Sequence, residues 1–206
     1  MEEFNLFQFA NPAGEEGYRL TKHMNEHHME LTKWGLDNLY IKPDDVALDI
    51  GCGGGNTAKL LCEAVNEVKA IDISKVSVES TIENNAETVA SGKLEVLRAN
   101  ASKLPFASCK FDLITAVETV YFWQDIMICF NEIYRTLKQG GTFCMLLETY
   151  ACEEQHEYNL KLKANIKGFN VYSPEQLEIY LTDAGFKDIL IFMRPDKPWI
   201  CCTATK

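Results

Sequence analysis

The chain has 206 residues, a length that suits one domain and can bury a substantial core. Hydrophobic residues make up 47% and charged residues 24%, which is an ordinary globular balance. The formal net charge is -10, with Lys and Arg scattered along the chain. Nucleic acid and anionic membranes both attract basic surfaces, so this composition argues against either partner. A small neutral or cationic partner suits the charge better.

Cysteine usage and the N-terminus indicate a soluble, cytoplasmic protein. The eight cysteines are irregularly spaced and form no Cys-x-x-Cys pair, so we expect reduced thiols. Residues 1–10 carry Glu2 and Glu3 and no basic stretch, which is unlike a secretory signal. No apolar run approaches the length of a transmembrane helix.

Strand and helix patterns alternate through the first three quarters of the chain. After a loose lead-in, residues 18–40 are helix-prone, and Pro43 ends that region. Short apolar runs predict strands at 46–50, 68–73, 94–98, 111–117 and 142–147, the last after a turn at Gln139-Gly140-Gly141. Helices are predicted at 57–65, 75–90 and 126–137. This alternation predicts βαβ units and a parallel sheet.

The C-terminal part follows a different pattern. Residues 150–172 have few strand signals and predict an irregular or helical insertion. Ser173 to Gln176 form a capping box that opens a helix ending at Gly185. Two last strands, 188–193 and 199–203, are joined by a link too short for a parallel crossover, so this pair is expected to be antiparallel. The fold class is therefore α/β: a doubly wound, Rossmann-like, seven-stranded and mostly parallel sheet with the last strand antiparallel, helices on both faces and an N-terminal helical lid.

A glycine-rich turn follows the first predicted strand and opens a helix. Its sequence, Asp49-Ile50-Gly51-Cys52-Gly53-Gly54-Gly55-Asn56, allows close backbone approach to a ligand at a helix N-terminus. A dinucleotide fingerprint would require a third glycine at position 56, where the chain has Asn56. The acid two residues before Gly51 disfavours a pyrophosphate but attracts an ammonium or sulfonium cation. A nicotinamide-dependent oxidoreductase is thus the weaker alternative.

This turn resembles the first motif of the class I S-adenosylmethionine-dependent methyltransferases, and the resemblance continues downstream in the family's order. Asp72-Ile73 at the end of the second strand resembles the motif in which the acid binds the ribose hydroxyls and the next residue packs on adenine. The segment 100–106, Asn-Ala-Ser-Lys-Leu-Pro-Phe, resembles the family's Asp-Ala-x-x-Leu-Pro-Phe, with Asn100 accepting from the adenine amino group. Residues 111–116 and 137–142 resemble the motifs of the fourth and fifth strands.

The resemblance is to small-molecule, type 11-like members and implies transfer of a methyl group from S-adenosylmethionine to a small-molecule acceptor. It implies one domain over 1–206: a lid at 1–43, a cofactor-binding core at 44–149, a substrate-side insertion at 150–172 and a C-terminal helix and strand pair at 173–206. The expected cofactor-binding residues are Asp49, Gly51, Cys52, Gly53, Asp72, Ile73, Asn100, Ala101, Ser102 and Val117. A non-catalytic S-adenosylmethionine-binding protein remains an alternative.

The methyl acceptor is expected beyond the fourth and fifth strands, since ligands of open parallel sheets bind at the carboxyl ends. Residues 117–123 should line that pocket; we interpret Phe122 and Trp123 as core, whereas Glu118 and Tyr121 are candidates for function. Glu148 and Tyr150, at the end of the fifth strand, are further candidates.

The N-terminal helix carries three histidines that need a separate interpretation. His23-Met-Asn-Glu-His27 matches the short His-x-x-Glu-His zinc pattern, but no third ligand can be placed, so no metal site is predicted. Met24-Asn25 followed by His27 and His28 resembles the helical lead-in of some bacterial small-molecule methyltransferases. The predicted catalytic residues are therefore His28, His27 or Tyr121, acting as a base where the acceptor carries a proton.

Overall fold

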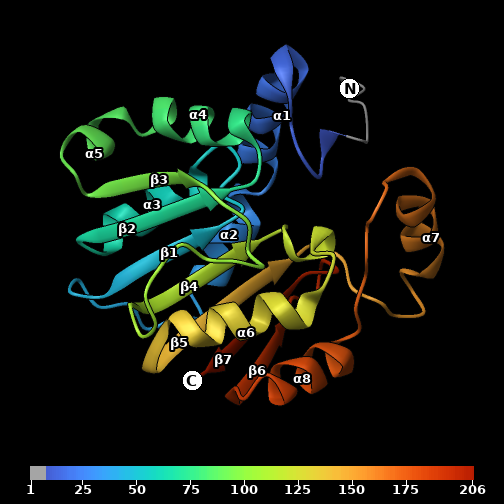
Figure 1. Cartoon of the computed structure of the whole chain (residues 1–206). Coiled ribbons are helices and arrows are strands. Elements are labelled where there is room, and N and C mark those ends of the chain that lie inside the picture. Colours follow the sequence, from blue (N-terminus) through green and yellow to red (C-terminus); the bar gives the residue numbers. More distant parts are fainter. Residues whose placement is uncertain (1–7) are drawn as a thin grey trace.

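A single mixed sheet forms the centre of the molecule in a computed structural model, which describes residues 8–206 (Figure 1). Its seven strands lie in the order β3-β2-β1-β4-β5-β7-β6. The pairs from β3 to β5 are parallel, and β7 is antiparallel to both β5 and β6. The predicted fold class, including the antiparallel final pair, is confirmed.

The elements alternate along the chain as the sequence predicted. The strands are β1 (Val46–Ile50), β2 (Glu67–Asp72), β3 (Leu94–Arg98), β4 (Phe111–Val117), β5 (Leu137–Leu147), β6 (Lys187–Met193) and β7 (Ile200–Thr205). The helices are α1 (Gly14–His27), α2 (Met29–Leu36), α3 (Asn56–Ala64), α4 (Lys75–Asn84), α5 (Ala86–Ala90), the short 3-10 helix η2 (Val120–Phe122), α6 (Ile126–Thr136), α7 (His156–Asn165) and α8 (Pro174–Asp183).

Helices cover both faces of the sheet, and each face has its own apolar core. Leu31 of α2 and Leu61 of α3 pack with β1 and β2 residues on one face. Phe130 of α6 and Leu177 of α8 pack with β4 and β5 residues on the other. Burial of these side chains on two faces explains why the central strands have nearly continuous apolar sequences. None of the helices within residues 8–206 has the length and apolar character needed to cross a membrane.

Two helices predicted as continuous are each broken. The helix-prone region 18–40 divides at His28, which has φ -88° and ψ 0°, and helical structure ends at Leu36. The helix predicted over 75–90 divides at Asn85, whose side-chain amide donates to Gly55 O and Thr81 O. A polar side chain that bonds nearby backbone carbonyls competes with helix continuation, and the sequence pattern does not reveal where this happens.

Smaller differences occur at the strand ends. The turn predicted at 139–141 is an irregularity within β5, where Phe111 pairs with Leu137 but Leu113 pairs with Thr142. Gly140 allows it with a φ of +77°. The capping box of α8 is confirmed: Ser173 Oγ accepts from Gln176 N, and Gln176 Oε1 accepts from Ser173 N.

Candidate active site

A cavity of about 700 Å³ lies at the carboxyl ends of β1, β2 and β4. This is the expected place for a ligand on an open parallel sheet. The lead-in to α1 and the segment that carries α7 both lie beyond these strand ends (Figure 1). Eight of the ten predicted cofactor residues line the cavity: Gly51, Gly53, Asp72, Ile73, Asn100, Ala101, Ser102 and Val117.

The glycine turn after β1 needs its glycines for two different reasons. Gly51 has a φ of +75°, and a Cβ there would collide with the Thr119 side chain. Gly53 has a φ of +52° but open space where its Cβ would be. The first glycine therefore allows close packing against the β4 end, and the second supplies only backbone conformation.

Asp72 fixes the turn from the end of β2. Its Oδ2 accepts from Gly53 N at 3.0 Å, and its Oδ1 accepts from Ser74 N at 2.8 Å. Burial raises the pKa of Asp72, while the backbone donors of Ser74 and Gly53 act to lower it. A carboxylate has about four acceptor positions, so capacity for ligand hydroxyls remains on a side chain already held in place.

Asp49 and Cys52, also predicted to bind the cofactor, do not line the cavity. Asp49 is 1% exposed; Thr115 Oγ1 donates to its Oδ1 at 2.9 Å, and no group within the described chain hydrogen-bonds its Oδ2. Burial raises the pKa of Asp49 to about 7. The Cys52 thiol accepts from Thr81 Oγ1 and its backbone N–H donates to Ile71 O. These two bonds fix the position of the glycine turn, and the side chain does not reach the cavity.

The residues after β2 and β3 that are predicted to bind adenine are an exposed apolar side chain, Ile73, and a hydrogen-bonded amide, Asn100. Ile73 is 45% exposed although it lines the cavity, which leaves an apolar side chain open to a ligand. Asn100 Oδ1 accepts from both Ser102 N and Ser102 Oγ at 2.9 Å. Since both lone pairs of that oxygen are engaged, the predicted acceptance from an adenine amino group is not supported, and the Asn100 amide N–H₂ is the group left for a ligand.

Tyr121 does not occupy the pocket position that we predicted. It is 1% exposed and absent from the cavity lining. Its hydroxyl lies 3.1 Å from Glu118 Oε1 and 3.0 Å from Thr149 O, and it accepts from Thr149 N. Burial raises the pKa of Tyr121 well above its usual value. The ring packs in the core because η2 turns it away from the cavity, so a role as base is not supported.

Glu118 is an acidic side chain of the cavity wall directly after β4. Its φ of +55° is uncommon for a residue with a side chain and indicates a backbone held in place by its surroundings. Its Oε1 accepts from Glu148 N and faces the Tyr121 hydroxyl. Burial and the neighbouring Glu148 carboxylate raise the pKa of Glu118.

Phe122 and Trp123, interpreted from the sequence as core, have a double role. Trp123 is 7% exposed and packs edge-to-face on Phe130 at 6.0 Å between ring centroids. Phe122 lies 5.7 Å from the Phe169 ring. Both also line the cavity, so the core interpretation holds in part and the cavity wall beyond β4 is aromatic.

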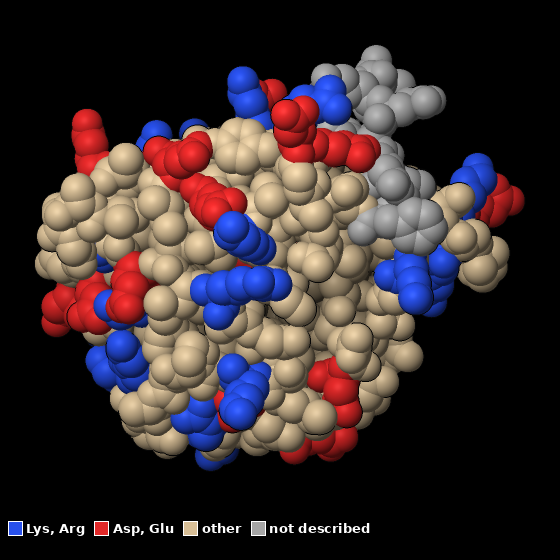
Figure 2. Space-filling model, turned by 45° about the horizontal axis from the view of Figure 1, so that its top comes forward, with Lys and Arg blue, Asp and Glu red and all other residues tan. Residues whose placement is uncertain are grey.

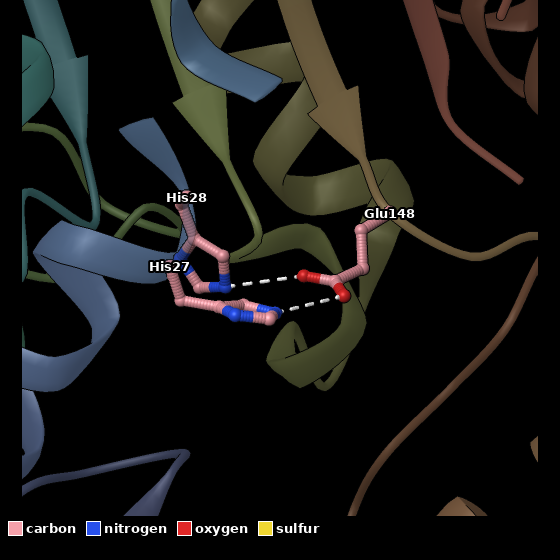
Figure 3. A group of neighbouring side chains, drawn as sticks. All are labelled: His27, His28 and Glu148. Carbon is pink, nitrogen blue, oxygen red and sulfur yellow. Dashed lines mark hydrogen bonds and ion pairs between the residues drawn. The ribbon is translucent and has the colours of Figure 1, made fainter. Parts of the chain in front are cut away.

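His27, His28 and Glu148 come together beside this wall (Figure 3). His27 Nε2 lies 3.2 Å from Glu148 Oε1, and His28 Nε2 lies 3.3 Å from Glu148 Oε2. Burial acts to raise the pKa of Glu148, but His28 and His27 outweigh it and lower the pKa. The two histidines do not line the cavity themselves; Glu118 connects their cluster to it. Tyr150, the other candidate after β5, is absent from the lining.

Several cavity residues gave no signal in the sequence. They come from the lead-in, the start of α6 and the insertion: Phe9 to Pro12, Gln124, Asp125, Ile128, Lys167, Gly168 and Asn170. Asn25 Nδ2 donates to Gly54 O at 2.9 Å, which docks α1 on the glycine turn. No local pattern predicts these contacts, because they join segments that are distant along the chain.

The fold and the cavity define a class: a doubly wound α/β protein with its ligand cavity at the carboxyl ends of the parallel strands. Residues 48–145 match the family described as a methyltransferase domain. A putative methyltransferase of Bacillus subtilis (strain 168), YrhH, is 30% identical over 148 residues, covering 71% of this chain and 77% of that protein. The chain therefore belongs to the class I S-adenosylmethionine-dependent methyltransferases, which excludes the nicotinamide-dependent alternative.

A longer relative and a solved structure are also similar to this chain. Cycloartenol-C-24-methyltransferase 1 of Oryza sativa subsp. japonica is 27% identical over 192 residues, covering 89% of this chain and 54% of that protein. The chain thus spans about half the length of this relative. A chain in the complex between the Haloferax volcanii Trm112 methyltransferase activator and the putative methyltransferase has a TM-score of 0.78 at 19% identity. That alignment covers 100% of this chain and 99% of the other, and it shows a shared fold.

Proposed function

We propose that this enzyme transfers the S-adenosylmethionine methyl group to a small-molecule acceptor by in-line displacement. The observation that carries the proposal is the continuity of one cavity from Asp72 and Ile73 at its cofactor end to Glu118 and Trp123 beyond β4. When bound, the cofactor supplies an electrophilic methyl group on a sulfonium. The protein's contribution is to align the acceptor and to exclude water.

The cofactor end has the hydrogen-bond donors, the acceptors and the negative charge that this ligand requires. We assign the Asp72 carboxylate to the ribose hydroxyls, Ile73 and Ala101 to the adenine faces, and the Asn100 amide N–H₂ to an adenine ring nitrogen. Asp49 acts from below the cavity surface, because a buried carboxylate with an unpaired oxygen attracts the ammonium and sulfonium charges of the ligand. Gly51, Gly53, Ser102 and Val117 complete the wall, and Cys52 supports it.

A small acceptor fits the walls of the cavity and the surface charge. The lead-in at 9–12 and the segment 167–170 both contribute to the lining, and we assign both as lids. On the face drawn in Figure 2, basic side chains are interspersed with acidic and uncharged ones and form no continuous patch. A nucleic acid acceptor would require such a patch.

The two predicted histidines, rather than Tyr121, are assigned to the acceptor end. His27 and His28 adjoin the cavity through Glu148 and Glu118.

All eight cysteines are unpaired in the structure, including Cys144 and Cys201, whose sulfurs are 3.7 Å apart. We therefore place the enzyme in a reducing compartment such as the cytoplasm.

Calorimetric titration with S-adenosylmethionine, S-adenosylhomocysteine and NAD tests the cofactor assignment. The first two should bind and NAD should not. Asp72→Ala should weaken binding about 100-fold, since it removes charged hydrogen bonds worth a few kcal/mol. Asp44→Ala removes an exposed acid and serves as the matched control. Unchanged affinity in Asp72→Ala would refute the ribose assignment.

Transfer of radiolabel tests the acceptor class. The enzyme is incubated with methyl-labelled S-adenosylmethionine and a cell extract, and the extract is then separated by ultrafiltration into small molecules and macromolecules. Label should appear in the small-molecule fraction only with active enzyme. Label recovered mainly in RNA or protein would contradict a small acceptor, and cofactor binding without transfer to any fraction would favour a non-catalytic binding protein.

A further inference from the structure

The His27, His28 and Glu148 side chains form a cluster whose donor atoms all lie within 4.8 Å of one another. Within residues 8–206 it is the only group of three or more His, Cys, Asp or Glu side chains arranged in this way. The histidines approach from the α1–α2 junction and the glutamate from the end of β5, so that both rings face the same carboxylate (Figure 3).

The backbone break between α1 and α2 makes this convergence possible. In a continuous helix, neighbouring side chains point about 100° apart, so consecutive histidines do not serve one site. His28 has φ -88° and ψ 0°, outside the helical range, and its ring lies edge-on to His27 at 5.2 Å between centroids. The helix is thus interrupted at His28, and both imidazoles face Glu148.

We propose that His27, His28 and Glu148 bind a divalent first-row transition-metal ion such as Zn²⁺ beside the acceptor end of the cavity. Two imidazoles and one carboxylate are a donor set that such ions prefer, and three protein ligands leave positions for water or substrate. Bonds of about 2.0–2.2 Å separate neighbouring ligand atoms by roughly 2.8–3.1 Å in octahedral geometry and by roughly 3.3–3.6 Å in tetrahedral geometry.

The observed separations agree with that geometry. The Nε2 to carboxylate distances are 3.2 Å for His27 and 3.3 Å for His28. All ligand atoms of the cluster lie within 4.8 Å of one another. The His27 side chain is 57% exposed, so its ring has room to rotate and bring its ligand nitrogen closer to that of His28. The same two distances also suit ion pairs between protonated histidines and Glu148, and this is the alternative that the experiment must separate.

The surroundings favour a cation. Glu118 lies directly beside Glu148, with its Oε1 accepting from Glu148 N, so two acidic side chains are close together at this place. Glu118 also lines the cavity, which places the open positions of a bound ion near the acceptor. Coordination of an acceptor atom to the ion rests on the proposed function, whereas binding of the ion itself does not.

Metal binding is measured on full-length protein freed of metal with a chelator, by calorimetry with Zn²⁺ and by the visible absorption of added Co²⁺. One Zn²⁺ should bind per chain, with Mg²⁺ at the same concentration giving no heat. Glu148→Gln and His28→Gln should each weaken Zn²⁺ binding at least ten-fold. His156→Gln, which removes an exposed histidine on α7, is the matched control and should bind normally.

A further variant separates this cluster from the zinc pattern in the sequence. His23→Gln should leave Zn²⁺ binding within a few-fold of wild type if Glu148 is the third ligand. Loss of binding in His23→Gln with none in Glu148→Gln would overturn the proposal, as would no Zn²⁺ binding or equal binding by every variant. S-adenosylmethionine affinity, measured in parallel, shows that Glu148→Gln is folded. Failure of the wild type to bind that cofactor would count against the proposed function alone.

Discussion

The two ends of the cavity are built in opposite ways. The proposed cofactor end consists of short segments that directly follow β1, β2 and β3, and the bonds that organise it, such as Gly53 N to Asp72, join neighbouring strands. The proposed acceptor end combines α1, the residues after β4 and β5, and the segment near 168. The first end is encoded in continuous motifs and the second in contacts between remote segments.

Gly51→Ala tests the cofactor end with the largest expected effect. Strain at φ +75° costs about 1–2 kcal/mol, and the collision with Thr119 adds to it, so S-adenosylmethionine binding should fall below detection. Gly92→Ala is the matched control because Gly92 has φ +77° but no atom near its Cβ position. Calorimetry and thermal unfolding of both variants separate the effect of backbone strain from that of the collision. Equal losses of cofactor affinity and of unfolding temperature in the two variants would show that close packing at Gly51 is unimportant.

Asp49→Asn tests whether a buried charge organises this end. The pKa of Asp49 is raised from 3.8 to about 7 in the folded state, so folded protein binds the extra proton and stability falls as pH rises from about 4 to 7. The loss is up to about 4 kcal/mol at 1.4 kcal/mol per pKa unit. Denaturant unfolding across this range should show a smaller loss in Asp49→Asn.

The same carboxylate predicts pH-dependent cofactor affinity. A cationic ligand favours ionised Asp49, so S-adenosylmethionine affinity should rise about ten-fold from pH 6 to 8 in wild type, with release of a proton. Asp49→Asn should bind weakly and without this dependence, while Asp44→Asn behaves as wild type. Identical pH profiles of wild type and Asp49→Asn would remove Asp49 from the cofactor site.

Tyr121→Phe sharpens the comparison at the acceptor end. The variant removes a buried hydroxyl that bonds Thr149 N and faces Glu118, so the free energy of unfolding should fall by about 1–3 kcal/mol. The shape of the pH–kcat profile should remain unchanged, because the hydroxyl does not reach the cavity. Loss of the basic limb of that profile would support Tyr121 as a base. The variant Tyr158→Phe, which changes a tyrosine on α7, serves for comparison.

Asn25→Ala addresses the contact that joins the two ends, with the smallest expected effect. Loss of the hydrogen bond to Gly54 O should weaken S-adenosylmethionine binding about two- to ten-fold, since one neutral bond contributes about 1 kcal/mol. Asn165→Ala, which removes a local bond to Lys161 O, should bind normally. If affinity in Asn25→Ala equals that of wild type, α1 does not hold the glycine turn in place.

Prediction from sequence succeeded where the pattern is local. The alternation of strands and helices and the antiparallel final pair followed from apolar runs and link lengths. Eight of the ten proposed cofactor residues line the cavity. It failed at Tyr121 because one turn of η2 decides which way a side chain faces. The breaks at His28 and Asn85 were missed because neither glycine nor proline marks them.

The sequence by itself determined the alternation of strands and helices, the glycine turn after β1 and the acids at the ends of β1 and β2. These features depend on residue period, backbone conformation and short-range bonding, all of which are written in consecutive residues. Only the tertiary structure decided that Asp49 is buried, that Tyr121 faces the core, and that Glu148 joins His27 and His28. Burial and the convergence of side chains depend on which surfaces pack together, and residues more than 100 positions apart carry no local record of that packing.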